Sequence, residues 1–409
     1  MPSTPPRSAT SSPAATRPWL VWALLVFVLA AWLAGVGGDV FTPSAYAHDT
    51  WLADAFLHGQ LHLRHVPEVA ADLAPMGGRT YVVFGPLPAL VLLPWVAFCG
   101  LATPDVLVLV LTALAAVWAF FHLLRRVLGD QDPALLACAT LTFALGTALH
   151  YGAPMGGVWL HTQITATALQ AFALLAAANG RARTAGLLLA LAVLTRPTVA
   201  LAAPFAWSLL APAAPPARKH DRGGAGVANA LALGVPMLAA VVVLGLYNAA
   251  RFGSPTDAGY LRQLISEPLA LRIREHGQFS PAFLPDNFFT LFLRGPAFEA
   301  GHAVPDPRGM SLLLTTPFLL LALWPRRWSA LESRALLTSL LIALPALLYY
   351  NDGSMQFGNR FALDWIVLGL LAAASAARQA PRPWLWVTTA WSLAAGAWGL
   401  HWFRAAFTR

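Results

Sequence analysis

Apolar runs of about transmembrane length recur along the whole chain, separated by short polar segments. A helix that crosses a bilayer needs about 20 mostly apolar residues. The run 133–180 is long enough for two helices and is divided by the glycine-rich segment 151–157. With that run counted twice, the predicted spans are 18–38, 80–104, 106–124, 133–180, 184–217, 223–250, 309–325, 335–351, 361–377 and 383–403. The pattern predicts an all-α polytopic membrane protein with about eleven transmembrane helices, within bounds of about ten and thirteen.

The composition supports the same class of protein. Hydrophobic residues make up 58% of the 409 residues and charged residues only 11%, whereas a soluble domain carries about 25% charged residues. The formal net charge of +8 comes from arginines scattered at the ends of apolar runs, so it does not indicate nucleic-acid binding. Cys99 and Cys138 both lie in apolar stretches, which gives neither a disulfide framework nor a cysteine metal site.

Arginines in short loops set the expected orientation, because they favour the cytoplasmic side. Arg7 and Arg17 precede the first span. We therefore expect 1–17 to be a disordered cytoplasmic tail and 18–409 to be a single transmembrane domain. The basic segment 218–222 also falls inside. The outer loops are then 39–80, 251–308 and 351–361, which together hold 12 of the 18 acidic residues.

Two groups of arginines conflict with this arrangement. Arg125 and Arg126, and later Arg181 and Arg183, would lie outside if eleven spans are counted in this way. Either the proline-rich segment 80–104 is re-entrant, or the segment 184–217 makes two passes. The sequence leaves both explanations open.

The first outer loop is predicted to contain a short helix with two aspartates. An apolar stripe of helical period begins at Trp51, and Gly59 is well placed to end it. This pattern predicts an amphipathic helix on the outer membrane surface. Asp49 has two interpretations: it either caps this helix or takes part in chemistry. Asp54 is most simply explained as a solvated residue of the polar face.

Histidines in the same loop are poor candidates for a metal site. His58, His62 and His65 are close in sequence, but their spacing does not place all three on one helix face. His48 stands beside Asp49, and one histidine with one aspartate does not define a metal site. The sequence therefore predicts no certain cofactor and leaves a divalent metal open.

Two arginines are expected at membrane depth. Arg196 interrupts an apolar run and is followed by Pro197, so it faces a cavity or a partner, or reaches to an interface. Arg360 ends the third outer loop, and Asp364 follows it at i,i+4 helical spacing. We expect Arg360 and Asp364 to form an ion pair, which either anchors the helix or has a functional role.

Several short motifs, in chain order, together resemble those of the bacterial GT-C superfamily of polytopic glycosyltransferases. The nearest branch is that of the protein O-mannosyltransferases and lipid A aminoarabinose transferases. The motifs are Leu57-His-Gly-Gln60, Tyr81-Val-Val-Phe-Gly-Pro-Leu-Pro88, Leu194-Thr-Arg-Pro197, Arg251-Phe-Gly-Ser-Pro255 with Gly259-Tyr260, and Phe357-Gly-Asn-Arg360.

The resemblance implies an inverting enzyme of the bacterial inner membrane that uses a polyprenyl-phosphate sugar donor on the non-cytoplasmic face. It also implies an aspartate of the first outer loop as general base. Asp49 matches that position by location, and Asp54 is the second candidate. His48, Arg196, Tyr260 and Arg360 are then the expected substrate-binding residues, the arginines on the lipid phosphate.

The residues fit this chemistry independently of the family. Transfer from a lipid phosphate needs a base for the acceptor hydroxyl and cations for the departing phosphate. An outer-loop carboxylate and arginines at membrane depth supply both. No glycine-rich nucleotide-binding pattern is present, so a nucleotide-sugar donor has no support. The acceptor, whether lipid, glycan or protein, is not specified.

Two other classes of membrane protein remain open. A transporter or flippase for polyprenyl lipids or glycolipids would share the spans and Arg196, although the internal repeat typical of transporters is missing. A non-catalytic lipid-binding protein would need only the basic sites. Activity that is lost in Asp49→Asn while lipid binding is kept would separate an enzyme from both.

Overall fold

The computed structural model describes residues 18–36, 39–129, 131–210, 219–324, 327–353 and 355–407. The chain is mainly helical. Its α-helices are α1 (Trp19–Val36), α2 (His48–Leu57), α3 (Leu87–Cys99), α4 (Asp105–Leu128), α5 (Pro133–Leu145), α6 (Leu149–Met155), α7 (Val158–Ala178), α8 (Ala182–Val193), α9 (Ala203–Leu210), α10 (Lys219–Phe252), α11 (Glu267–His276), α12 (Leu284–Phe292), α13 (Leu312–Thr315), α14 (Ala330–Leu347), α15 (Ile366–Ala377) and α16 (Arg382–Phe407).

Short 3-10 helices and two small hairpins connect these helices. The 3-10 segments are η1 (Asp39–Phe41), η2 (Gly100–Ala102), η3 (Pro197–Ala202), η4 (Tyr260–Arg262), η5 (Pro281–Phe283), η6 (Pro317–Leu323) and η7 (Arg360–Asp364). The antiparallel hairpins are β1 (Leu73–Met76) with β2 (Arg79–Val82), and β3 (Ala297–Glu299) with β4 (His302–Val304). The β3–β4 hairpin lies within the predicted outer loop 251–308, and the β1–β2 hairpin begins in the loop 39–80 and ends at Val82, inside the predicted span 80–104.

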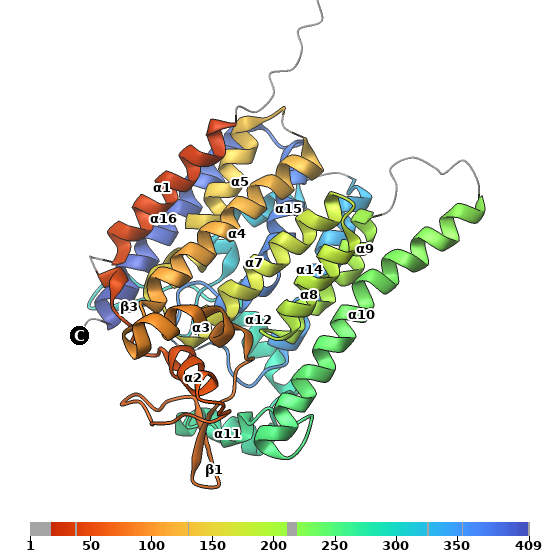
Figure 1. Cartoon of the computed structure of the whole chain (residues 1–409). Coiled ribbons are helices and arrows are strands. Elements are labelled where there is room, and N and C mark those ends of the chain that lie inside the picture. Colours follow the sequence, from red (N-terminus) through yellow and green to blue (C-terminus); the bar gives the residue numbers. More distant parts are fainter. Residues whose placement is uncertain are drawn as a thin grey trace, which may run out of the picture.

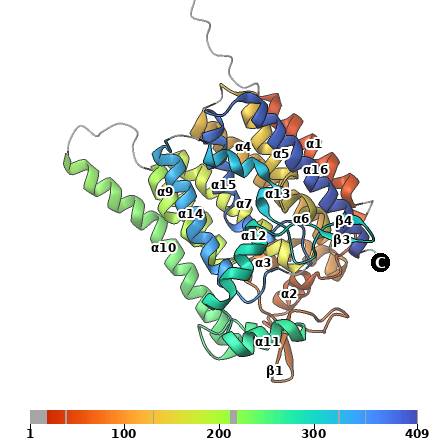
Figure 2. The same ribbon diagram turned by 180° about the vertical axis from the view of Figure 1, so that it is seen from behind.

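The long helices run between two ends of a bundle, and the outer-loop elements α2, β1 and α11 gather at one of them (Figure 1). Viewed from behind, α14 lies in the bundle and α10 leans away from it (Figure 2). Contacts with neighbouring helices fix the positions of α4 and α8. α4 packs most extensively against α7, and α8 packs between α7 and α10.

Contacts at the start of α4 determine which end carries the disputed arginines. The side chain of Asp105 accepts hydrogen bonds from Ser44 of the first outer loop. α4 has 24 residues and is therefore about 36 Å long. Arg125 and Arg126 in its last turn thus lie at the opposite end from the outer loops, which is the end expected to be cytoplasmic.

The structure breaks both of the segments on which the two explanations depend, so re-entrance of 80–104 and two passes by 184–217 both remain predictions. The predicted span 80–104 is not one helix: it holds β2 and α3, a helix of 13 residues with Pro94 inside it. α3 packs on α2 and begins where the Leu87 N–H donates to the Leu194 carbonyl. The segment 184–217 consists of α8 and, after a break at Arg196, η3 and α9. Neither segment is therefore one continuous helix.

By length and composition, three described helices could each cross a membrane: α4, α14 and the 225–252 part of α10. A fourth is obtained if α5 and α6, bent by 49°, count as one span. The total of eleven spans remains a prediction. The tail predicted over 1–17 lies outside the described residues, as does position 218 of the basic segment.

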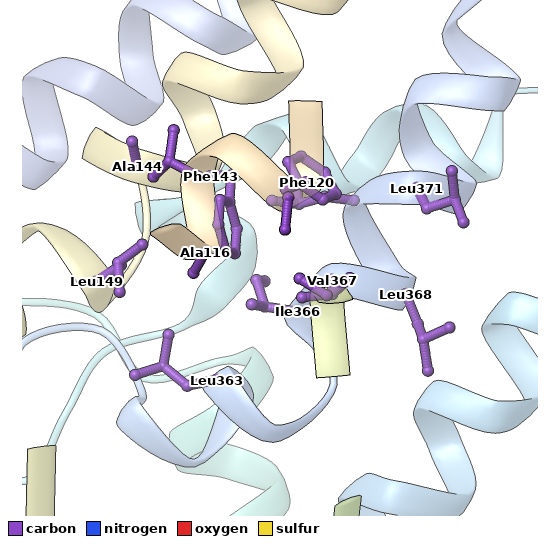
Figure 3. Packing of buried hydrophobic residues seen from close by; sticks show 14 of the residues in the cluster. Ala116, Phe120, Phe143, Ala144, Leu149, Leu363, Ile366, Val367, Leu368 and Leu371 are labelled. Atoms are coloured by element: carbon purple, nitrogen blue, oxygen red, sulfur yellow. The ribbon is translucent and has the colours of Figure 1, made fainter. Parts of the chain in front are cut away.

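The core of the bundle is built from close helix contacts through small residues. Phe120 of α4 and Phe143 of α5 pack with ring centroids 4.6 Å apart, beside Ile366 and Val367 of α15 (Figure 3). A Cβ atom on Gly396 would lie 2.0 Å from the Leu145 carbonyl oxygen. Helices α16 and α5 can therefore approach this closely only because position 396 is glycine.

The predicted helix of the first outer loop is present as α2. It ends as expected before Gly59, which has a φ of +70°. The expectation that it lies on the membrane surface does not match its packing, because His48, Asp49 and Leu52 are buried and α2 rests on α3. Asp49 does not cap it either: the residue before the helix is Ala47, and no side chain provides a cap.

Single-cysteine labelling tests this arrangement. In a background without Cys99, which is exposed, and Cys138, we expect Ala71→Cys to react with an impermeant maleimide on intact cells. Arg181→Cys is expected to react only after permeabilisation, because it follows α7 at the opposite end. Labelling of both positions from the same side would contradict this topology.

Candidate active site

Two cavities lie beneath the outer loops and share part of their walls. The arginine cavity, of about 370 Å³, is lined by Arg196, Tyr260 and Asp364 among others. The loop cavity, of about 390 Å³, is lined by Ser44, Tyr46, Tyr151, Leu264 and Phe403 among others. The residues common to both are Asp72, Trp159, Asn351 and Arg360. The structure thus brings together Arg196, Tyr260 and Arg360, three of the residues that the sequence predicts for substrate binding.

Arg196 is held by a fork of contacts to one carboxylate. Its Nε donates to Asp364 Oδ1 at 2.6 Å, and its Nη2 donates to Asp364 Oδ2 at 2.8 Å. The Thr198 hydroxyl donates to the same Oδ2 at 2.9 Å. The expected pair between Arg360 and Asp364 is therefore wrong, because Asp364 is fully engaged by the chain that turns back at Arg196.

The local sequence accounts for this geometry. Pro197 has no N–H and follows an extended Arg196, so α8 cannot continue. On the other side, η7 is fixed by α7: the Gln170 amide donates to the Asp364 carbonyl at 2.8 Å. The Thr167 hydroxyl donates to the Leu363 carbonyl at 2.9 Å. Two breaks in helical structure thus face each other, which is where polar groups can be matched at membrane depth.

Arg360 has a different environment from Arg196. Its guanidinium lies 5.6 Å from the ring centroid of Trp159 and 5.4 Å from that of Phe361. Its Nε is buried without a hydrogen-bond partner, and no ion pair with Arg360 is found in the described part of the chain. Arg360 therefore presents its positive charge to both cavities without a direct ion pair among the described residues, although the Asp72 carboxylate lies near enough to interact with it electrostatically. An arginine held in this way can bind an anion.

Asp72 is a cavity residue that the sequence analysis missed. Its carboxylate accepts a hydrogen bond from Trp159 Nε1 at 3.0 Å, and its φ of +65° is unusual for an aspartate. Burial raises the pKa of Asp72, and the nearby Arg360 partly offsets this effect. The Asp72 N–H donates to the Leu264 carbonyl at 2.9 Å. Contacts between two outer loops, including this one and that of the Gln263 amide with the Asp72 carbonyl, bring Asp72 to the cavities, so no local motif signals it.

Asp49 is buried in the first turn of α2. Both of its carboxylate oxygens lack a hydrogen-bond partner, and Asp105 and His161 are close enough to influence it electrostatically. Burial raises the pKa of Asp49 to about 7; His161 lowers it and Asp105 raises it further. Asp49 does not line either cavity, although Tyr46 does. Asp105 and His161, whose Oδ2 and Nε2 are 3.6 Å apart, were also not singled out from the sequence.

The remaining candidates lie away from the cavities. Asp54 forms an ion pair with Arg64 at 3.1 Å, which agrees with its interpretation as a face residue. His48 Nε2 makes a hydrogen bond with the Val69 carbonyl at 3.0 Å and is buried. No group of three or more His, Cys, Asp or Glu side chains within the described ranges is arranged to hold a metal ion. The Asp49, Asp105 and His161 cluster does not meet that arrangement.

The buried ion pair yields a prediction about stability. In Asp364→Asn, Arg196 keeps its charge without a counter-ion, and we expect the free energy of unfolding to fall by about 3–5 kcal/mol. The matched control is Asp257→Asn, which removes a partly exposed pair with Arg262 and should cost only about 0.2–1 kcal/mol. Denaturant unfolding in detergent measures both, and equal losses would contradict the structural role of Asp364.

No model of a known protein family matches this chain, and no curated protein does either. Among solved structures, the chain is similar to ArnT from Cupriavidus metallidurans in the apo state, with 14% identity over 90% of this chain and 61% of that chain and a TM-score of 0.47. ArnT bound to undecaprenyl phosphate is 13% identical over 90% of this chain and 62% of that chain, with a TM-score of 0.46. The chain is also similar to the archaeal oligosaccharyltransferase AglB from Archaeoglobus fulgidus, in complex with an inhibitory peptide and a dolichol-phosphate. The identity is 13% over 95% of this chain and 56% of that chain, and the TM-score is 0.44.

The chain spans only about three fifths of the length of these proteins. The sequence motifs resemble those of the GT-C superfamily, and ArnT and AglB are solved structures to which the chain is similar at this level. No residue role follows from similarity at this level.

Proposed function

We propose that the protein is a membrane glycosyltransferase that moves a sugar from a polyprenyl-phosphate donor to an acceptor hydroxyl on the non-cytoplasmic face. The observation that carries this proposal is Arg360, which has no direct ion pair among the described residues and faces a cavity beside the Arg196 and Asp364 pair. A donor phosphate placed there would receive charge-assisted hydrogen bonds. The low dielectric constant around it would strengthen the contact.

The shared wall of the two cavities gives each substrate a place. The donor headgroup would occupy the arginine cavity, where Tyr260 is available for a sugar hydroxyl. The acceptor enters the loop cavity from the outer side, where Ala71 and Leu264 are exposed. Asp72 and Arg360 line both cavities, so the acceptor oxygen and the anomeric carbon would meet beside them.

In the reaction, the acceptor oxygen bonds to the anomeric carbon while the bond from that carbon to the phosphate oxygen breaks. Arg360 stabilises the negative charge of the leaving polyprenyl phosphate. Arg196, which Asp364 holds in a fixed position, also stabilises this charge. Attack opposite the leaving phosphate inverts the anomeric carbon. The acceptor proton passes to a carboxylate of the first outer loop, and we propose Asp49 as that base.

Two properties support Asp49 over its neighbour Asp54. Its oxygens have no partner in the described structure, whereas Asp54 is held by Arg64, and unmatched buried polar groups call for a functional explanation. A pKa of about 7 also suits a base that works near neutral pH. Catalytic contacts often form only when substrate binds, so the position of Asp49 outside the cavity lining does not exclude this role.

The predicted role of Asp49 is tested by a pair of asparagine variants. Asp49→Asn should lower turnover by about a hundred- to ten-thousand-fold, because a general base contributes that much, while polyprenyl-phosphate binding is retained. In the wild type, only ionised Asp49 accepts a proton, so the rate should fall as pH is lowered through about 7. Asp54→Asn is the control and should keep most activity. The reverse ranking would move the base to Asp54.

The phosphate contacts are tested by arginine-to-lysine variants, because lysine keeps the charge and loses the fork. Arg360→Lys should weaken binding of polyprenyl phosphate about tenfold or more, since one charge-assisted hydrogen bond is worth about 1.5–3 kcal/mol. Arg196→Lys should weaken it less, because that fork already holds Asp364. Arg262→Lys, at a partly exposed pair, is the control. Full affinity in Arg360→Lys would make this arginine structural.

The function itself is tested by incubating purified protein with a panel of polyprenyl-phosphate sugars and lipid, glycan or protein acceptors. Release of polyprenyl phosphate together with a glycosylated product supports the proposal. If a polyprenyl phosphate binds and no donor turns over, the transport or lipid-handling alternative replaces it.

A further inference from the structure

A second polar pocket lies at the end of the bundle opposite the outer loops. It has a volume of about 410 Å³ and is formed between α4 and α7, which lie side by side in Figure 1. Its walls include Trp118, His122 and Arg126 from α4, and Leu175 and Asn179 from α7. It is separate from both cavities of the candidate active site, since it shares no lining residue with them.

The three residues from α4 follow one another at i,i+4 spacing and therefore share one face of the helix. The rings of Trp118 and His122 are 4.2 Å apart, and Trp118 also stacks on Phe172 of α7 at 5.9 Å. Arg126 lies about 12 Å further along the axis than Trp118. The pocket thus changes from aromatic and apolar on the bundle side to cationic at the helix ends.

Arg126, on the cationic side of the pocket, is held in place and forms no ion pair with an acid in the described part of the chain. Arg126 Nε donates to the Asn179 side-chain oxygen at 3.1 Å, its one hydrogen bond among the described residues. Asn179 is itself fixed by donating to the Leu175 carbonyl at 2.9 Å. Asp132, a described acid that follows α4 in the chain, already pairs with Arg382 at 2.8 Å.

We propose that this pocket binds the headgroup of an anionic phospholipid of the inner leaflet. The phosphate would contact Arg126 and Asn179, and an acyl chain would run along Leu175 and Trp118. Basic pockets between transmembrane helices on the cytoplasmic side suit anionic headgroups, and tryptophan is favoured at the depth where headgroup meets chain. A free phosphate ion would use Arg126 and leave the apolar half of the pocket without a role.

Delipidated full-length protein in neutral detergent provides the test, with phosphatidylglycerol, phosphatidylcholine and inorganic phosphate as separate probes. Native mass spectrometry measures bound lipid, and thermal unfolding measures stabilisation. We expect phosphatidylglycerol to bind in preference to phosphatidylcholine. Arg126→Gln should weaken that binding about tenfold, the effect of losing one charge-assisted hydrogen bond. Arg334→Gln, at an exposed arginine of α14, should leave it unchanged.

A second variant, Trp118→Leu, keeps the charge and removes the aromatic wall. It should weaken phosphatidylglycerol binding and leave any effect of inorganic phosphate unchanged. If Arg126→Gln and Arg334→Gln lose phosphatidylglycerol binding equally, the lipid is attracted nonspecifically and the proposal is overturned. Inorganic phosphate that stabilises as strongly as the lipid would overturn the lipid assignment. Sugar transfer from polyprenyl phosphate is measured separately, so its absence does not bear on this result.

Discussion

The ion pair of Arg196 with Asp364 is the interaction on which the arrangement of the site depends. Two charges at membrane depth are tolerated only when they are matched and hydrogen-bonded. Matching them requires the break after α8 to face the break before α15, although 168 residues separate them. Once those two breaks are joined, neither segment can fill the space between them with a continuous helix. The arginine cavity is the space that remains.

The same pair explains why Arg360 is left without a counter-ion. Asp364 accepts two hydrogen bonds from Arg196 and one from Thr198, and the 3-10 geometry of η7 does not turn it toward Arg360. Arg360 is then held by aromatic rings and by the backbone bond of its N–H to the Gln356 side chain at 2.8 Å. A structural arginine would normally be paired with an acid. A buried arginine that is held in place without a direct ion pair has the properties expected of an anion-binding group.

The sequence predicted much of the fold and part of the site, and the errors have physical causes. Apolar periodicity located the helices, and Gly59 correctly marked the end of α2. The i,i+4 rule failed for Arg360 and Asp364 because η7 is a 3-10 helix; with about three residues per turn, the fifth residue points elsewhere. Asp72 could not be found at all, since its position depends on contacts with a loop about 190 residues later.

Asp72 and Asp49, the two carboxylates near the site, differ in what limits their contact with an acceptor hydroxyl. Asp72 reaches both cavities, but Trp159 and Gln263 hold it in place. Asp49 is free of such partners, but it is enclosed with Asp105 and His161. Its enclosure raises the pKa because the charged form has lost its water, and the same loss makes that form more basic toward any hydroxyl that reaches it. Exclusion of water before the acceptor arrives would also protect the donor from hydrolysis, because no activated water could stand in the place of the acceptor.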